Sequence, residues 1–293
     1  MKVLVLGSNG MLGHMACRAF STRHEVFATS RSQVDDQNRT LHFLPKGSCA
    51  GEVDSGDTKR LEAIFRNFRP EVVLNCIGII KQKREAHETI TSIQVNSLFP
   101  HQLAQLGSAY GAKVIFFSTD CVFSGKRGRY SEADTPDPID LYGRSKLLGE
   151  VQEAPHLTIR CSIIGRELSA STGLIEWFLS QRGREIQGFS KAIYSGLTTR
   201  ALCQLLMDLL EKRCDLSGIW HIASEPISKF DLLGRLVAPL GLGIQIHENV
   251  TFECDRSLDS TQFTKETGLR IPSWEEMLAD LVEDAKNYEY WRR

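Results

Sequence analysis

The chain begins with a short apolar run that passes directly into a glycine-rich turn and a helical pattern. Residues 2–6 read KVLVL, which predicts a strand buried on both faces, and Gly7, Gly10 and Gly13 follow in a G-x-x-G-x-x-G spacing. Gly7 permits a tight turn, Gly10 lets the backbone approach a pyrophosphate, and Gly13 lets the helix pack closely. A strand, a glycine turn and a helix N-terminus together predict a dinucleotide site, with a purely structural turn as the alternative.

Strand-length apolar runs and helical patterns alternate through the first half of the chain. Further strands are predicted at residues 25–29, 71–76, 114–117 and 158–164. Helices are predicted up to about residue 20 and at residues 58–68 and 91–106. This alternation predicts an α/β fold with a Rossmann-type doubly wound parallel sheet, which binds ligands at the carboxyl ends of its strands.

The pattern changes after residue 164, and no long linker separates the two parts. We predict a NAD(P)-binding domain at residues 1–164 and a smaller substrate-binding lobe at residues 165–293, with a strand near 219–222 that could return to the first domain. Helices are expected at residues 174–179, 199–210, 227–240 and 273–288, and a loop at residues 188–199. Ser228 is a candidate N-cap for the third of these helices.

Several side chains near the predicted strand ends bear on the cofactor. The second strand ends in Ser30, Arg31 and Ser32, where an NAD site often carries an acid. An arginine with hydroxyl neighbours suits a 2′-phosphate instead, so we predict NADP (NADPH) as the cofactor, with NAD as the alternative. If Arg31 has no role in binding, it is a solvated surface residue. Asp54 could meet the adenine edge or only start a helix. Gly78 would let backbone lie against the cofactor.

Residues 114–150 carry the predicted chemistry. The strand at 114–117 ends in Ser118, Thr119 and Asp120, and a later helix opens with Tyr142 and Lys146. These two residues are four apart and share a helix face, so the lysine ammonium is expected to lower the pKa of the tyrosine. Tyr142 would then exchange a proton with a substrate oxygen that the Thr119 hydroxyl also binds.

Composition bounds the remaining possibilities. A formal net charge of −1 over 293 residues gives no basic field for nucleic acid or for an anionic membrane. The eight cysteines show no C-x-x-C pair and no zinc-like His spacing, so no metal is expected. No apolar run approaches the length of a membrane span, and no signal peptide precedes the first strand, so we expect a cytoplasmic protein. A homodimer stays open on base rates.

The glycine loop, the S-T-D-C-V-F-S-G run at residues 118–125 and the Tyr142-Gly-Arg-Ser-Lys146 motif occur in the order typical of one family. The chain resembles the extended short-chain dehydrogenases/reductases, and within them the dTDP-4-dehydrorhamnose reductase branch. The resemblance implies that Thr119, Tyr142 and Lys146 are catalytic. It also implies a nicotinamide cofactor and a nucleotide-sugar substrate whose 4-keto group is reduced for surface polysaccharide synthesis. The expected cofactor contacts are Gly7, Asn9, Gly10, Met11, Leu12, Ser30, Arg31, Asp54, Cys76, Gly78, Ser118, Tyr142 and Lys146.

The expected substrate contacts differ in part from the family pattern. They are Thr119, Asp120, Cys121, Ile163 and Tyr194. Cys121 stands where the rhamnose reductases usually carry tyrosine, and Ile163 stands where they carry a substrate-binding tryptophan. The substrate is therefore left open between dTDP-4-dehydrorhamnose and a UDP-linked N-acetylated 4-keto-6-deoxyhexose.

Two other functions compete with reduction. An epimerase or dehydratase would keep its NAD(P) bound and return the hydride, but dehydratases usually add an acid beside the Ser/Thr pair, and no Glu follows Asp120. A non-catalytic NADP-binding regulatory subunit would need a partner protein and no proton donor. The complete set of Thr119, Tyr142 and Lys146 favours an enzyme.

Overall fold

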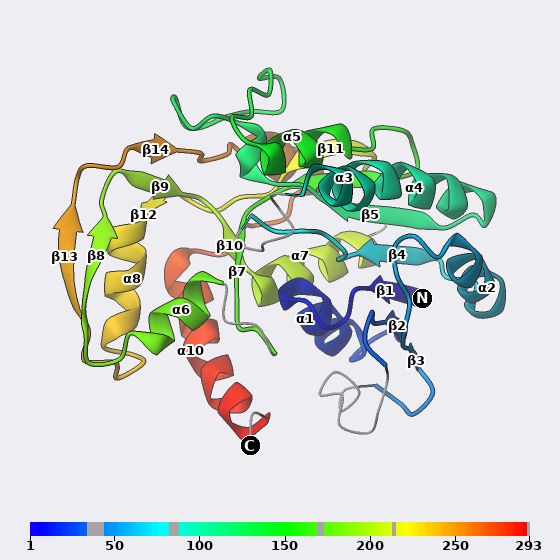
Figure 1. The fold of residues 1–293 in the computed structure, drawn as a ribbon, viewed down its shortest axis with the longest axis horizontal. Helices are drawn as coiled ribbons and strands as arrows, with labels where there is room; N and C mark the ends of the chain where they lie inside the picture. Colours follow the sequence, from blue (N-terminus) through cyan, green and yellow to red (C-terminus); the bar gives the residue numbers. More distant parts are fainter. Residues whose placement is uncertain (34–43, 82–87, 169–172, 213–214, 292–293) are drawn as a thin grey trace.

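A computed structural model describes residues 1–33, 44–81, 88–168, 173–212 and 215–291. Seven parallel strands form its central sheet, in the order β11-β6-β5-β4-β1-β2-β3 (Figure 1). Their bounds are β1 Lys2–Leu6, β2 Glu25–Thr29, β3 Cys49–Ala50, β4 Val72–Asn75, β5 Lys113–Phe117, β6 Leu157–Arg160 and β11 Gly218–His221. Strands β2 and β3 lie on one side of β1, whereas β4, β5 and β6 lie on the other. A ligand site is expected at the carboxyl ends of β1 and β4, where the strand order reverses. The predicted Rossmann-type fold is confirmed.

Alternate residues of the strands build two separate cores. On β1, Val3 and Val5 pack on one face with residues of α1, whereas Leu4 and Leu6 pack on the other face with residues of α2 and α4. The helices are α1 Met11–Phe20, α2 Thr58–Phe68, α4 Phe99–Ala109, α5 Leu141–Leu148 and α7 Thr199–Glu211. Each strand residue therefore faces a helix, which explains the continuous apolar runs of the sequence.

The second half of the chain adds short strands and further helices beside the sheet (Figure 1). The strands are β7 Ile163–Ile164, β8 Glu185–Phe189, β9 Ala192–Tyr194, β10 Leu197–Thr198, β12 Ile227–Ser228, β13 Gln245–Asn249 and β14 Cys254–Asp255. The helices are α6 Leu174–Ser180, α8 Lys229–Val237, α9 Thr261–Thr267 and α10 Trp274–Trp291. β11 returns to the edge of the main sheet beside β6. The division of the chain at residue 164 stays a prediction.

Three predicted elements differ from those observed. The expected loop at 188–199 contains β9 and β10, because these segments pair with β12, β14 and β7 from distant parts of the sequence. The expected strand at 158–164 divides into β6 and β7, which pair with different partners. The expected helix at 91–106 is α3 Thr89–Ser92, a π-helical stretch Ile93–Leu98, and then α4 with Pro100 in its first turn. The cap by Ser228 is confirmed, since its hydroxyl accepts from Asp231 N at 3.0 Å.

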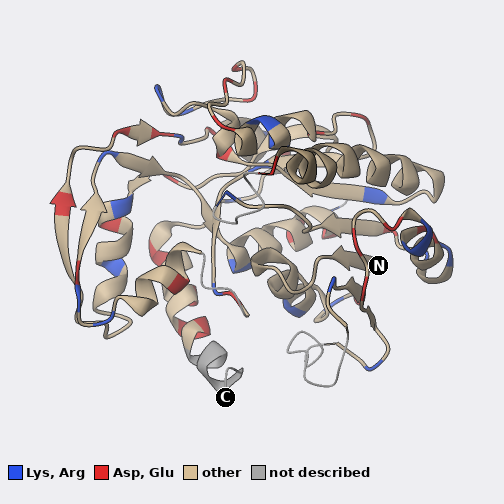
Figure 2. Cartoon of the chain, viewed as in Figure 1, with Lys and Arg blue, Asp and Glu red and all other residues tan. Residues whose placement is uncertain are grey.

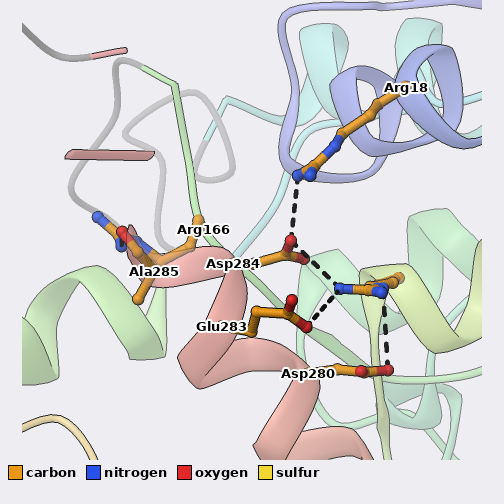
Figure 3. A network of polar contacts seen from close by, with 7 residues as sticks. Arg18, Arg166, Asp280, Glu283, Asp284 and Ala285 are labelled. Carbon is orange, nitrogen blue, oxygen red and sulfur yellow. Dashed lines mark hydrogen bonds and ion pairs between the residues drawn. The ribbon is translucent and has the colours of Figure 1, made fainter. Parts of the chain in front are cut away.

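Acidic residues of α10 bind arginines of α1 and α7. Asp284 accepts from Arg18 at 3.1 Å and lies 3.4 Å from Arg200, which also approaches Asp280 and Glu283 (Figure 3). Asp284 is buried, so these contacts fasten the C-terminal helix to α1 and α7.

Charged residues of both signs are interspersed over the helices and loops in the view of Figure 2, in keeping with the small net charge. Within the described residues, no helix has the length and apolar character needed to cross a membrane. No His, Cys, Asp and Glu cluster suited to a metal ion occurs in that part of the chain. Cys214 and residues 34–43 lie outside the described residues.

Candidate active site

The glycine turn lies between the end of β1 and the start of α1. Gly7 has φ +80°, a conformation that favours glycine, and a Cβ there would meet Cys76 O at 3.1 Å. A Cβ on Gly13 would lie 2.1 Å from Gly7 O, so α1 can approach the turn only because residue 13 has no side chain. The first turn of α1 has no side-chain cap, which leaves its N–H groups available to an anion.

Alanine substitutions at Gly10 and Gly13 are expected to differ in their effects on stability and on NADPH binding. A Cβ on Gly10 meets nothing closer than 3.4 Å, whereas one on Gly13 clashes with backbone. Gly13→Ala should therefore lower the thermal midpoint by several degrees, and Gly10→Ala should fold normally but bind NADPH more weakly by about tenfold, because the methyl occupies the phosphate approach. Calorimetry and fluorescence titration measure the two effects. Equal stability losses in both variants would contradict the assignment of Gly10 to ligand contact.

Five other predicted cofactor residues lie in the glycine turn, at the start of α1 or after the end of β2. Asn9 Nδ2 donates to Ser30 Oγ at 2.8 Å, which joins the glycine turn to the end of β2. Arg31 follows and is exposed. Met11 and Leu12 open α1, but Leu12 is only 7% exposed and packs in the core, so its backbone alone can face a ligand.

Asp54 makes a local hydrogen bond in the turn before α2. Its Oδ1 accepts from Gly56 N at 2.9 Å in an exposed turn before α2. The carboxylate therefore organises the turn that leads to Asp57, whose side chain caps α2 by accepting from Arg60 N. Contact between Asp54 and an adenine stays a prediction.

Asn96 braces the loop that carries Gly78. Its amide bonds both backbone groups of Ile79, at 2.9 Å and 3.1 Å, and also reaches Ser145 Oγ at 3.2 Å. A Cβ on Gly78 would lie 3.6 Å from Asn96 Oδ1 and 4.0 Å from Lys146 Nζ. Lys146 therefore lies where three segments meet: the end of β4, the π-helical turn and α5. The Cys76 carbonyl lies next to Gly7.

Thr119 and Asp120 leave the end of β5 together. Thr119 Oγ1 accepts from Cys121 N at 3.1 Å and caps one turn of 3₁₀ helix, Asp120–Val122. The same hydroxyl donates to Asp120 Oδ1 at 3.2 Å, and burial raises the pKa of Asp120. Both side chains are less than 10% exposed.

Tyr142 and Lys146 bring the same face of α5 to this strand end. Thr119 acts on the pKa of the Tyr142 phenol, so the two side chains lie close together, and Lys146 Nζ donates to Phe117 O at 2.6 Å. Asp140 accepts from Gly143 N at 2.8 Å and so fixes the first turn of the helix. The structure thus assembles Thr119, Tyr142 and Lys146 from two elements that are distant in sequence.

The expected effect of Lys146 on the pKa of Tyr142 is wrong. Burial is the largest influence and raises the pKa of Tyr142 above its ordinary value, with further raising by Cys121 and Asp120. Lys146 does not offset this, because its ammonium is directed at Phe117 O and burial lowers its own pKa to about 8. Tyr142 is therefore a neutral phenol at neutral pH, which is the form that can donate a proton.

The lowered pKa of Lys146 predicts a pH-dependent stability. Between its folded pKa of about 8 and the ordinary value of 10.5, the unfolded chain holds a proton that the folded chain has released. The free energy of unfolding must then rise with pH over this interval. Denaturant titrations should show wild type gaining stability relative to Lys146→Met between about pH 8 and about pH 10. A difference that stays constant with pH contradicts the lowered pKa.

Ser118 turns away from this group of residues. Its Oγ donates to Glu150 Oε1 at 2.6 Å, and Glu150 forms a bidentate pair with Arg160 at 2.8 Å and 2.7 Å. Arg160 and Glu150 therefore form a buried structural ion pair. The Ser118 hydroxyl therefore belongs to a buried hydrogen-bond network behind the site, and its contact with the cofactor stays a prediction.

The remaining predicted substrate residues are placed unequally. Cys121 follows Asp120 and is half-buried, as is Ile163 on β7. Tyr194 is 8% exposed and packs in the core, with no hydrogen-bond partner for its hydroxyl in the described part of the chain. Sequence reasoning missed Arg256, whose Nε donates to Phe123 O at 2.9 Å beside Cys121. No local motif marks this arginine; only the contact between β14 and the loop after β5 brings it here.

Comparisons with known proteins cover nearly the whole chain. The sequence model of the RmlD substrate binding domain matches residues 1–287. A probable low-salt glycan biosynthesis reductase, Agl14, from Haloferax volcanii is 26% identical, with 98% of this chain and 99% of that protein aligned. Methionine adenosyltransferase 2 subunit beta from Danio rerio is 27% identical over 89% of this chain and 87% of its own.

A solved structure supports the same fold. The dTDP-4-dehydrorhamnose reductase of Bacillus anthracis, determined in complex with NADP, superposes with a TM-score of 0.78 at 21% identity. The alignment covers 97% of this chain and 99% of that one. At this identity the likeness establishes the fold, and it includes both the sheet and the second lobe.

Proposed function

Because the chain belongs to the RmlD substrate binding domain family, we propose that it reduces the 4-keto group of a nucleotide-activated 6-deoxy sugar with NADPH. One relative is a dTDP-4-dehydrorhamnose reductase from Aggregatibacter actinomycetemcomitans, and the solved reductase with the same fold was determined in complex with NADP. One observation supports the proposal for this chain: Tyr142, which burial keeps as a neutral phenol, lies beside Thr119 at the carboxyl end of β5. A surface polysaccharide pathway is the expected setting.

The residues of the glycine turn fit a dinucleotide. Gly7 and Gly10 leave the backbone uncovered next to the uncapped N-terminus of α1, where a pyrophosphate gains hydrogen bonds and a favourable dipole. The same edge of the sheet carries Asn9 and Ser30, which are already hydrogen-bonded to each other. When bound, NADPH supplies the hydride.

The chain's own residues divide the remaining work. Thr119 and Tyr142 would both hydrogen-bond the substrate carbonyl oxygen and hold it in line. Tyr142 would donate its phenolic proton as negative charge develops on that oxygen. Lys146, near Gly78, would hold the ribose hydroxyls on the nicotinamide side and exchange its present bond to Phe117 O for them. Asp120 would bind a sugar hydroxyl.

The substrate choice rests on the pocket positions that differ from the family pattern. Cys121 and Ile163 replace larger side chains, which favours an additional substituent such as an N-acetyl group. The test is consumption of NADPH, and separately NADH, with dTDP-linked and UDP-linked 4-keto-6-deoxy sugars, and identification of the product by NMR. Stoichiometric oxidation supports reduction. Turnover without net NADPH oxidation, with cofactor retained through purification, supports an epimerase.

Arg31 predicts the cofactor preference. It is exposed directly after Ser30, where the 2′-phosphate of NADPH would lie. Arg31→Ala should raise the KM for NADPH by about tenfold to a hundredfold and leave the KM for NADH nearly unchanged, because one charge-assisted contact to phosphate is lost. Steady-state kinetics with each cofactor measure this. An equal change for both cofactors would show that Arg31 does not read the phosphate.

A regulatory role is the second candidate, favoured by the similarity to the methionine adenosyltransferase subunit. A protein with that role would bind NADP and a partner enzyme without needing the Tyr142 proton. Partner activation that survives Tyr142→Phe, together with absent sugar reduction in wild type, would support it over the reductase.

A further inference from the structure

The guanidinium of Arg256 lies against the loop that follows the predicted catalytic threonine. Arg256 comes directly after β14, in the second half of the chain. Its Nε donates to Phe123 O at 2.9 Å, and its Nη1 lies 3.8 Å from Cys121 Sγ. The side chain is half-buried, so these contacts hold a positive charge partly out of water, next to Cys121, which is two residues after Thr119.

The charge of Arg256 has no close counter-ion. The two buried arginines, Arg160 and Arg166, each pair with a glutamate, at 2.7 Å and 2.8 Å. Among the residues that the structure describes, no carboxylate lies within 4.0 Å of Arg256, although Asp120 and Asp140 act on it electrostatically at longer range. A half-buried cation of this kind is stabilised by an anionic ligand.

Neither nearby acid is available to become that partner. Asp140 binds Lys81 Nζ at 2.7 Å and Gly143 N at 2.8 Å, so each of its oxygens already has a partner. Asp120 accepts from Thr119, and burial raises its pKa, which disfavours its charged form. Nη2 of Arg256 donates to no group in the described part of the chain, which leaves one edge of the guanidinium for a ligand.

We propose that Arg256 binds an oxyanion of the substrate, and so contributes to substrate choice at this site. The inference rests on the proposed function, because it places the oxyanion and the reacting carbonyl on one molecule. A planar guanidinium suits two oxygens of a phosphate or a carboxylate. The oxyanion has two sources, the diphosphate of the sugar nucleotide or an acidic substituent on the sugar ring.

Binding of UDP and dTDP to the full-length protein tests the inference without turnover. Isothermal titration calorimetry would compare wild type, Arg256→Gln and Arg256→Lys. The matched control is Arg235→Gln, which removes an equal charge from an exposed position on α8. NADPH affinity and the thermal midpoint report whether each variant is folded with an intact cofactor site.

If Arg256 binds the diphosphate, Arg256→Gln weakens binding of the nucleoside diphosphates by about tenfold to a hundredfold, with Arg256→Lys intermediate and Arg235→Gln unchanged. If it binds the sugar, nucleotide affinity is unchanged and the KM for the sugar nucleotide rises by a similar factor. The inference is overturned if Arg256→Gln matches wild type in both assays, or if wild type binds neither nucleotide and reduces neither sugar. If nucleotide binding depends on Arg256 but the protein reduces no sugar, the proposed reductase function is wrong and the inference about Arg256 stands.

Discussion

Tyr142→Phe should lower kcat for sugar reduction by about a hundredfold to ten-thousandfold, because general acid catalysis by a placed side chain contributes a factor of this size. The substitution removes only the hydroxyl group of Tyr142, and Thr119 stays at the end of β5. NADPH affinity should change by no more than about twofold, since the ring is kept. Single-turnover oxidation of NADPH measures the chemical step directly.

The chain offers a matched control for this substitution. Tyr110 follows α4, and its hydroxyl donates to Glu62 at 3.3 Å on the exposed side of the molecule. Tyr110→Phe removes the same atom and should leave kcat unchanged. If Tyr142→Phe retained a tenth or more of wild-type kcat, another group, for which Asp120 is the nearest acid, would have to supply the proton.

Arg160→Met should lower the free energy of unfolding by about 3–5 kcal/mol, because it leaves the Glu150 carboxylate buried without its counter-ion. The side chains of Arg160 and Glu150 are 5% and 3% exposed, and they approach to 2.7 Å. Glu150 also accepts from Ser118, so the loss of Arg160 loosens the strand end that presents Thr119. Urea denaturation followed by circular dichroism measures the change.

An exposed ion pair with the same nitrogen–oxygen distance separates the effect of burial from that of the pairing itself. Arg270 and Glu276 also approach to 2.7 Å, but their side chains are 72% and 47% exposed. Arg270→Met should cost less than about 1 kcal/mol, because water and salt screen that pair. The double variant Arg160→Met with Glu150→Leu should recover much of the loss, since no unpaired charge then remains. Equal losses at Arg160 and Arg270 would refute the role of burial.

Local patterns in the sequence were sufficient for the parallel sheet and for the glycine turn. Apolar runs such as residues 2–6 read as buried strands because helices cover both faces of a parallel sheet, and the structure places Val3 and Leu4 in opposite cores. The four-residue spacing of Tyr142 and Lys146 predicted a shared helix face, because side chains four apart on a helix are neighbours. Both inferences depend only on backbone geometry, which nearby residues determine.

Other features were decided by contacts between distant segments. β9 and β10 exist because β7, β12 and β14 pair with them, and two- or three-residue strands carry too little pattern to predict. The raised pKa of Tyr142 comes from burial, and the direction of Ser118 comes from Glu150, neither of which spacing reveals. Arg256 reaches Phe123 across 133 positions of sequence. The sequence by itself therefore determined the sheet, the turn and the residue types of the site. Only the tertiary structure decided which charged side chains are paired and that Tyr142 keeps its proton, because burial and long-range contacts determine pKa values and ion pairing.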